Sequence, residues 1–218
     1  MCNYSESYAK LKIIIDCLQD TYDDINSKFK YDIDKSLNFK KILVKDLTNE
    51  SEAYKYILAY QQFLNEKSFE IVEKIEDLNF IKKPTSRIKN IHSIEYKINN
   101  YKSKKHENGN IPVLKCFNDL FGARIILSQA LTHKEIKKFI RDNYQDKYKC
   151  IDSSKGDYVA THIYFKNSNY NLPWELQVWN ECSEERNIRS HRVYKQEYVE
   201  WEKRNKREIL KKGVSCNV

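Results

Sequence analysis

Two segments with alternating side chains constrain the fold of this chain more than any other feature. Tyr158–Phe165 and Trp174–Trp179 both alternate with a period of two, which predicts two β-strands. Successive side chains of a strand point to opposite faces. Each segment therefore has one apolar face and one face with polar or ring side chains, which include His162 in the first segment and Glu175 and Gln177 in the second.

Helical and extended patterns alternate along the rest of the chain. Apolar residues at steps of three and four predict a long amphipathic helix over residues 5–29 and a second helical stretch from Ser51 toward Leu78, which Pro84 ends. Further strands are expected at 86–90 and 123–127, and further helices at 93–101, 132–144 and 184–212. Strands interleaved with helices predict an α+β fold with a mixed sheet flanked by helices.

The same patterns suggest three parts. Residues 1–80 would form an N-terminal helical extension, residues 81–182 the core with the sheet, and residues 183–218 a basic C-terminal helical segment packed on that core. A chain of 218 residues suits one sizeable domain with such extensions.

Composition excludes several classes of protein. Apolar residues make up 40% of the chain and charged residues 32%, which favours a soluble globular protein without membrane spans. The six cysteines include no CxxC pair and no zinc-finger spacing, and the first ten residues lack an apolar segment. We therefore expect reduced thiols in a cytoplasmic protein.

Charged side chains at the predicted sheet suggest a site for a metal and a triphosphate. Mg²⁺ prefers one or two carboxylates together with phosphate oxygens of the substrate, and phosphoryl-type transfer depends on positioning and charge neutralisation. The candidates are two carboxylates and four cations: Asp119, Glu175, Arg87, Lys89, Lys97 and Arg124. Such residues are common on any surface, so this pattern alone is weak.

Five motifs in a consistent order resemble the RelA/SpoT-type synthetases, and among them the small alarmone synthetases and their toxic, tRNA-modifying members. SRIKNIHSIEYKI (86–98) resembles the ATP-binding R-x-K-x-x-x-S-I-x-x-K element, and NDLFGARIIL (118–127) the D-[IL]-x-G-x-R-I-I segment. YVATH (158–162) is similar to the acceptor loop, WELQVW (174–179) to the E-x-Q strand, and HRVYK (191–195) to the trailing H-x-x-Y-K. Together they span about 110 residues, roughly half of the chain.

The resemblance implies a nucleotidyltransferase-like mixed sheet and an ATP-dependent pyrophosphokinase. Such an enzyme transfers the β,γ-pyrophosphate of ATP to a ribose 3′-hydroxyl and leaves AMP, with Mg²⁺ as cofactor. By position, Asp119 would be a Mg²⁺ ligand. Glu175 would be the second carboxylate, which holds the metal or accepts the proton of the attacking hydroxyl.

The resemblance also assigns the binding residues. The ATP phosphates would be held by Arg87, Lys89, Ser93 and Lys97, supported by Arg124. On the acceptor side, the ring of Tyr158 would stack on the base, His162 would orient the acceptor, and Gln177 would order the strand or the acceptor pocket.

Three departures from the family pattern bear on the function. The first histidine is His92, so the N-terminal His/Asp hydrolase site of the bifunctional members is not expected and the chain would be a synthetase only. Asp157 stands where the acceptor loop usually has Gly. Trp179 replaces the usual Arg of the E-x-Q-x-R strand, and an indole cannot make the charge-assisted bonds of an Arg to a phosphate-bearing acceptor.

The net charge of +8 is concentrated in two blocks. Residues 81–105 hold eight Lys and Arg against one acid and overlap the predicted ATP site, whereas residues 186–212 hold ten against four. The second block is either a solvated helix or a groove for an RNA backbone. The candidate RNA-binding residues are Arg189, Arg192, Lys195, Lys203 and Arg204.

The favoured hypothesis is therefore a translation-inhibiting toxin that pyrophosphorylates the 3′-CCA adenosine of tRNA. The first alternative is the same transfer to GDP or GTP, which makes (p)ppGpp. A second alternative is an inactive domain that serves as an RNA-binding or interaction module. The N-terminal helices could dock an antitoxin protein or mediate self-association, and the sequence sets no oligomeric state.

Overall fold

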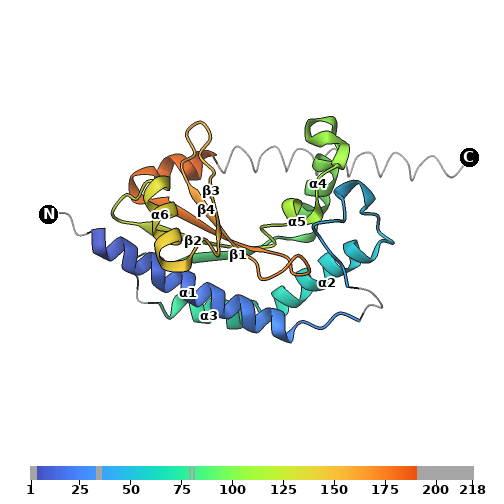
Figure 1. Ribbon diagram of the computed structural model, residues 1–218, viewed down its shortest axis with the longest axis horizontal. Coiled ribbons are helices and arrows are strands. Elements are labelled where there is room, and N and C mark those ends of the chain that lie inside the picture. The colour runs from blue at the N-terminus through green and yellow to red at the C-terminus, as the bar shows by residue number, and fades with distance from the viewer. Residues whose placement is uncertain (1–3, 33–35, 79, 81, 191–218) are drawn as a thin grey trace, which may run out of the picture.

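The computed structural model describes residues 4–32, 36–78, 80 and 82–190 (Figure 1). The helices, with short 3₁₀ helices written η, are α1 (Tyr4–Lys28), η1 (Val44–Asp46), α2 (Glu52–Glu66), α3 (Ser68–Glu76), α4 (Ile91–Tyr101), η2 (Lys104–Gly109), α5 (Val113–Cys116), α6 (His133–Tyr144) and η3 (Glu181–Ser183). The strands are β1 (Thr85–Ile88), β2 (Phe121–Leu127), β3 (Lys149–Asp152), β4 (Thr161–Phe165) and β5 (Trp174–Asn180).

The strands form one five-stranded sheet in the order β1-β2-β5-β4-β3. The central strands β2 and β5 are parallel, and the other neighbours are antiparallel. Helices flank this sheet, and α1 and α3 lie side by side along one side of it in Figure 1. The predicted α+β class with a mixed sheet flanked by helices is confirmed.

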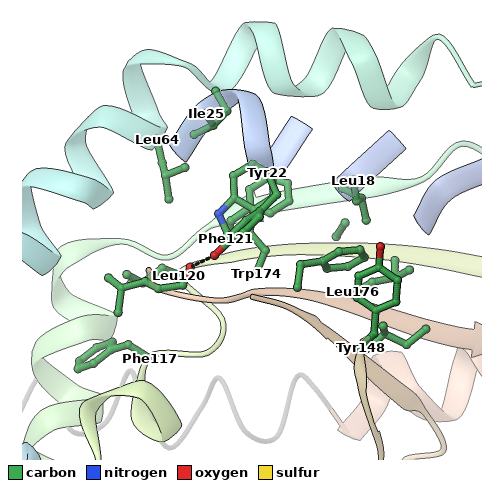
Figure 2. Packing of buried hydrophobic residues seen from close by; sticks show 14 of the residues in the cluster. Leu18, Tyr22, Ile25, Leu64, Phe117, Leu120, Phe121, Tyr148, Trp174 and Leu176 are labelled. Carbon is green, nitrogen blue, oxygen red and sulfur yellow. Dashed lines mark hydrogen bonds between the residues drawn. The ribbon is translucent and has the colours of Figure 1, made fainter. Parts of the chain in front are cut away.

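The core lies between the helices and one face of the sheet. Trp174 of β5 is fully buried there, with its ring centroid 4.1 Å from that of Phe121 and 5.4 Å from that of Tyr22 in α1 (Figure 2). Its indole nitrogen donates to the hydroxyl of Tyr60 in α2, 3.0 Å away. Full burial of a large apolar side chain stabilises a fold by about 1.5–3 kcal/mol. Strand β5 is therefore fixed to both N-terminal helices through one side chain.

Individual elements depart from the predicted boundaries. The helix expected from 51 to 78 is two helices, separated at Lys67 (φ −91°, ψ 2°). This break allows α2 to pack on β1 while α3 packs on α1. The strand expected from 158 begins only at 161, because both backbone groups of Val159 bond to the side chain of Asn187, each at 2.8 Å.

Two further elements complete this comparison. Strand β3 was not predicted, since its four residues are too few for a clear alternation. The expected helix 184–212 is helical over 184–190, and the rest lies outside the described residues. Within the described part of the chain, no helix combines the length and the apolar character needed to cross a bilayer.

Candidate active site

The strand registers bring the predicted site residues to the face of the sheet opposite the core. Gly122 of β2 lies between Arg87 of β1 and Glu175 of β5. Two residues further along, Arg124 of β2 pairs with Gln177 of β5. Since side chains two residues apart share a face, we call this the polar face.

Glu175 is buried at the centre of the polar face, with 5% of its surface exposed. Its Oε1 accepts a hydrogen bond from Gln177 Nε2 at 2.8 Å, and its Oε2 lies 3.1 Å from His162 Nδ1. Burial alone would raise the pKa of Glu175, but the contact with His162 outweighs it and lowers the pKa below its usual value. Glu175 is therefore ionised at neutral pH, as a proton acceptor must be.

His162 links Glu175 to Tyr158. An ionised carboxylate can only accept, so Nδ1 carries the proton shared with Glu175. His162 Nε2 lies 3.0 Å from the hydroxyl of Tyr158, and this hydroxyl accepts from Trp179 Nε1 at 3.2 Å. The hydroxyl of Tyr164 lies 3.4 Å from His162 Nδ1. Tyr164 had no predicted role, although it shares the alternating strand face with His162.

Arg124 closes this network into a ring. Its Nε and one terminal nitrogen donate to Gln177 Oε1 at 3.2 and 2.9 Å. Its guanidinium carbon lies 3.5 Å from the ring centroid of Trp179, a cation–π contact. Trp179 is 1% exposed. The Trp179 indole therefore contacts both Arg124 and Tyr158.

Asp119 forms a second charged cluster just before β2. Its two oxygens pair with Lys89 Nζ at 2.7 Å and Lys97 Nζ at 2.8 Å. The backbone holds Lys89 in place, because its N–H donates to the carbonyl of Leu120 at 2.8 Å and its carbonyl accepts from Gln61 Nε2 at 3.1 Å. The structure thus brings Asp119 against the two lysines of the motif 86–98.

The charges of this cluster offset its burial. Burial would raise the pKa of Asp119, but Lys97 and Lys89 outweigh it and hold the pKa well below its usual value. Burial lowers the pKa of Lys89. For Lys97, burial is outweighed by Asp119, which raises the pKa. A carboxylate with two lysines carries net positive charge, which suits a phosphate-bearing ligand.

The other predicted ATP residues lie on β1 and at the start of α4. Arg87 is exposed, and Ser93 lies in the first turn of α4, where its backbone N–H donates to the N-cap side chain of Asn90. A cavity of about 80 Å³ lies between β1, β2 and β5, with Arg87 and Arg124 in its lining. A Cβ added at Gly122 would meet no atom within 4 Å. The face beside Glu175 is thus open at Gly122.

The basic blocks have mixed roles in the structure. In the first block, Lys82 pairs with Glu181 and Glu184 at 2.8 and 2.7 Å. In the second, Arg189 is exposed and lies 3.5 Å from Glu185. The other four candidate RNA-binding residues lie outside the described residues: Arg192, Lys195, Lys203 and Arg204.

The carboxylates fit Mg²⁺ only as an ion shared with a substrate. Within the described ranges no group of three or more His, Cys, Asp and Glu side chains could hold a metal ion. Asp119 and Glu175 could each supply one carboxylate, and Mg²⁺ commonly takes one or two carboxylates with phosphate oxygens and water.

Comparison with known proteins gives structural neighbours among the small alarmone synthetases. No family model and no curated protein matches the sequence. Small alarmone synthetase 1 from Bacillus subtilis is 16% identical over 67% of this chain and 81% of its own, with a TM-score of 0.40. The same protein bound to its product pppGpp is 14% identical over 77% and 99%, with a TM-score of 0.38.

Small alarmone synthetase 2 from Bacillus subtilis is 18% identical over 77% of this chain and 100% of its own, with a TM-score of 0.36. Values this low carry no weight for the chemistry of this chain. Its function has to be inferred from its own residues.

Proposed function

We propose that the chain is a Mg²⁺-dependent ATP pyrophosphokinase, which transfers the β,γ-pyrophosphate of ATP to a ribose 3′-hydroxyl and releases AMP. The observation that carries this proposal is the buried, ionised Glu175 beside the open surface at Gly122. Cations surround this point on the donor side, with Arg87 on the neighbouring strand and Lys89 and Lys97 at Asp119.

Each group has a role in this transfer. Arg87, Lys89 and Lys97 bind the phosphates and offset the charge of the transferred group. Glu175 accepts the proton of the attacking hydroxyl as the bond from oxygen to the β-phosphorus forms and the bond to the α-phosphate oxygen breaks. Mg²⁺, held by Asp119 and Glu175 with phosphate oxygens, would neutralise charge on the phosphates.

The acceptor we favour is the 3′-terminal adenosine of tRNA, which would make the chain a translation-inhibiting toxin with an antitoxin partner. Two sequence features support this choice: Trp179 in place of a phosphate-binding Arg, and the basic block 186–212. The second candidate is GDP or GTP as acceptor, supported by the complete cation set and the motif for the acceptor loop. An inactive module is disfavoured because both carboxylates and their partners are present.

One experiment separates these functions. The protein is incubated with Mg²⁺, ATP labelled at the γ-phosphate, and either deacylated tRNA or GDP and GTP. We expect label on tRNA. Label on GDP or GTP alone would reject the tRNA hypothesis. Label on neither acceptor would reject the proposal that the chain is a pyrophosphokinase.

A matched pair of variants tests the proton acceptor. Glu175→Gln keeps the shape of the side chain but removes its basicity, so transfer should fall about 10²–10⁴-fold. Glu73→Gln makes the same change on the exposed surface of α3 and should leave the rate unchanged. Full activity of the Glu175 variant would overturn the site assignment.

A further inference from the structure

A second cavity, of about 320 Å³, lies beside the polar face and is lined by lysines. Its size falls within the range of small-molecule sites, roughly 300–1,000 Å³. We call it the lysine pocket, after its five lysines: Lys40, Lys115, Lys147, Lys149 and Lys166. They come from four stretches of the sequence, with Lys147 and Lys149 in the same one, and lie outside both basic blocks, so the sequence alone did not single them out.

The charge of the lysine pocket is not balanced by protein. No Asp or Glu lines it among the described residues, and none of its lysines forms an ion pair there. Lys166 Nζ donates only to the neutral Asn169 at 3.0 Å, and Lys147 Nζ lies 5.4 Å from the ring centroid of Tyr148. Five cations around one hollow repel each other, and an anion with several charges would relieve this repulsion.

The pocket adjoins the candidate active site at β4 and at the segment just before β2. Its lining includes Tyr164, which pairs with Glu175 across the strands, and Asn118, the neighbour of Asp119. In the strand order, Arg87 is on the edge strand β1 and Lys149 on the opposite edge strand β3. The strand that carries Glu175 lies between them, so Arg87 and Lys149 flank the proton acceptor from opposite sides.

We propose that the lysine pocket binds the phosphate groups on the 5′ side of the acceptor ribose. This inference rests on the proposed function and assigns the acceptor side of the same site. Phosphates held there would position the acceptor with its 3′-hydroxyl toward Glu175. The 5′-diphosphate of a free nucleotide and the phosphodiester of an RNA 3′ end share this chemistry.

The test uses the double variant Lys115→Ala/Lys149→Ala, because both side chains are exposed and line the pocket. The control is Lys134→Ala/Lys138→Ala, which removes the same charge from exposed positions of α6. Pyrophosphate transfer is measured with GDP, GTP and deacylated tRNA as separate acceptors. For the acceptor that is used, KM should rise at least tenfold in the pocket variant, with the KM for ATP within twofold of the wild-type value.

The separate acceptors also show whether the bound phosphates belong to tRNA or to a free nucleotide. With tRNA, the slope of log affinity against log salt should become shallower by about 0.7 for each phosphate that the variant no longer binds. With a nucleotide acceptor, the rise in acceptor KM should be larger for GTP than for a nucleoside without phosphate. An unchanged acceptor KM would overturn the proposal. A rise in the KM for ATP alone would assign the pocket to the donor instead.

Binding of inorganic pyrophosphate, measured by calorimetry with a non-hydrolysable ATP analogue in the donor site, separates this inference from the proposed function. The pocket variant should bind pyrophosphate at least tenfold more weakly than the control variant. Equal binding would reject the lysine pocket whatever the transfer assay shows. Weaker binding in the pocket variant without transfer to any acceptor would reject the proposed function, and with it the acceptor role, but would retain the pocket as a phosphate site.

Discussion

Replacement of Asp119 by asparagine removes the counter-charge that Lys89 and Lys97 share. The three side chains are only 14%, 12% and 18% exposed, and both ion pairs are shorter than 3 Å. Loss of one partner of a buried ion pair costs about 3–5 kcal/mol, because the remaining charge is left without compensation. The asparagine oxygen can still accept from one lysine, so we expect the lower value, about 3 kcal/mol.

The assay is thermal and urea unfolding of Asp119→Asn beside the wild type. For a domain of this size a loss of 1 kcal/mol lowers Tm by about 2–4 °C, so Tm should fall by about 6–12 °C. Asp142→Asn is the matched control. Its carboxylate is 48% exposed beside Arg141, and an exposed pair contributes about 0–1 kcal/mol. Adding Lys97→Met to the Asp119 variant should restore part of the stability, because it removes one uncompensated charge.

The pH dependence gives a second measurement of the same cluster. The pKa of Asp119 is lower in the folded protein than in the unfolded chain, where it is about 3.9. Its contribution is therefore fully present above that unfolded value and is lost as pH falls toward the folded pKa. The stability difference between wild type and Asp119→Asn should be constant above about pH 5 and should shrink as the pH falls below about 4. A variant with the wild-type Tm, or with a difference independent of pH, would refute the reasoning.

Two further substitutions probe the polar face. Gly122→Val adds a side chain where no atom lies within 4 Å of the Cβ position, so it should leave Tm unchanged or higher. The same side chain should raise the KM for ATP at least tenfold. Normal ATP kinetics would show that the donor does not cross this position. Trp179→Phe keeps a ring beneath Arg124 but removes the N–H that donates to Tyr158. The acceptor KM should therefore rise several-fold while the KM for ATP stays constant. Equal changes in both KM values would contradict the hydrogen-bond network from Trp179 to Glu175.

The alternating strand patterns were sufficient to predict which side chains share a face. His162 and Tyr164 on β4, and Glu175, Gln177 and Trp179 on β5, lie on the polar face as expected, because a strand has a period of two whatever its neighbours are. The long first helix was also predictable, since its apolar residues follow the helical period along its whole length. These are local properties of the chain.

The tertiary structure decided the contacts between distant segments. Strand order and register place Gly122 between Arg87 and Glu175, and no local pattern specifies which strands are neighbours. The structure also shows that Trp179 donates to Tyr158 and contacts Arg124, two contacts that the sequence pattern did not indicate.

The lysine pocket is the clearest case of this distinction. Its lysines are spread from residue 40 to residue 166, and each is indistinguishable in the sequence from any solvated surface residue. Only the folding of α5, β3 and the end of β4 around one hollow brings them together. The sequence by itself determined the chemistry that each strand face offers, whereas long-range packing determined which charges face one another, because Coulomb energies depend on distances that only the folded chain sets.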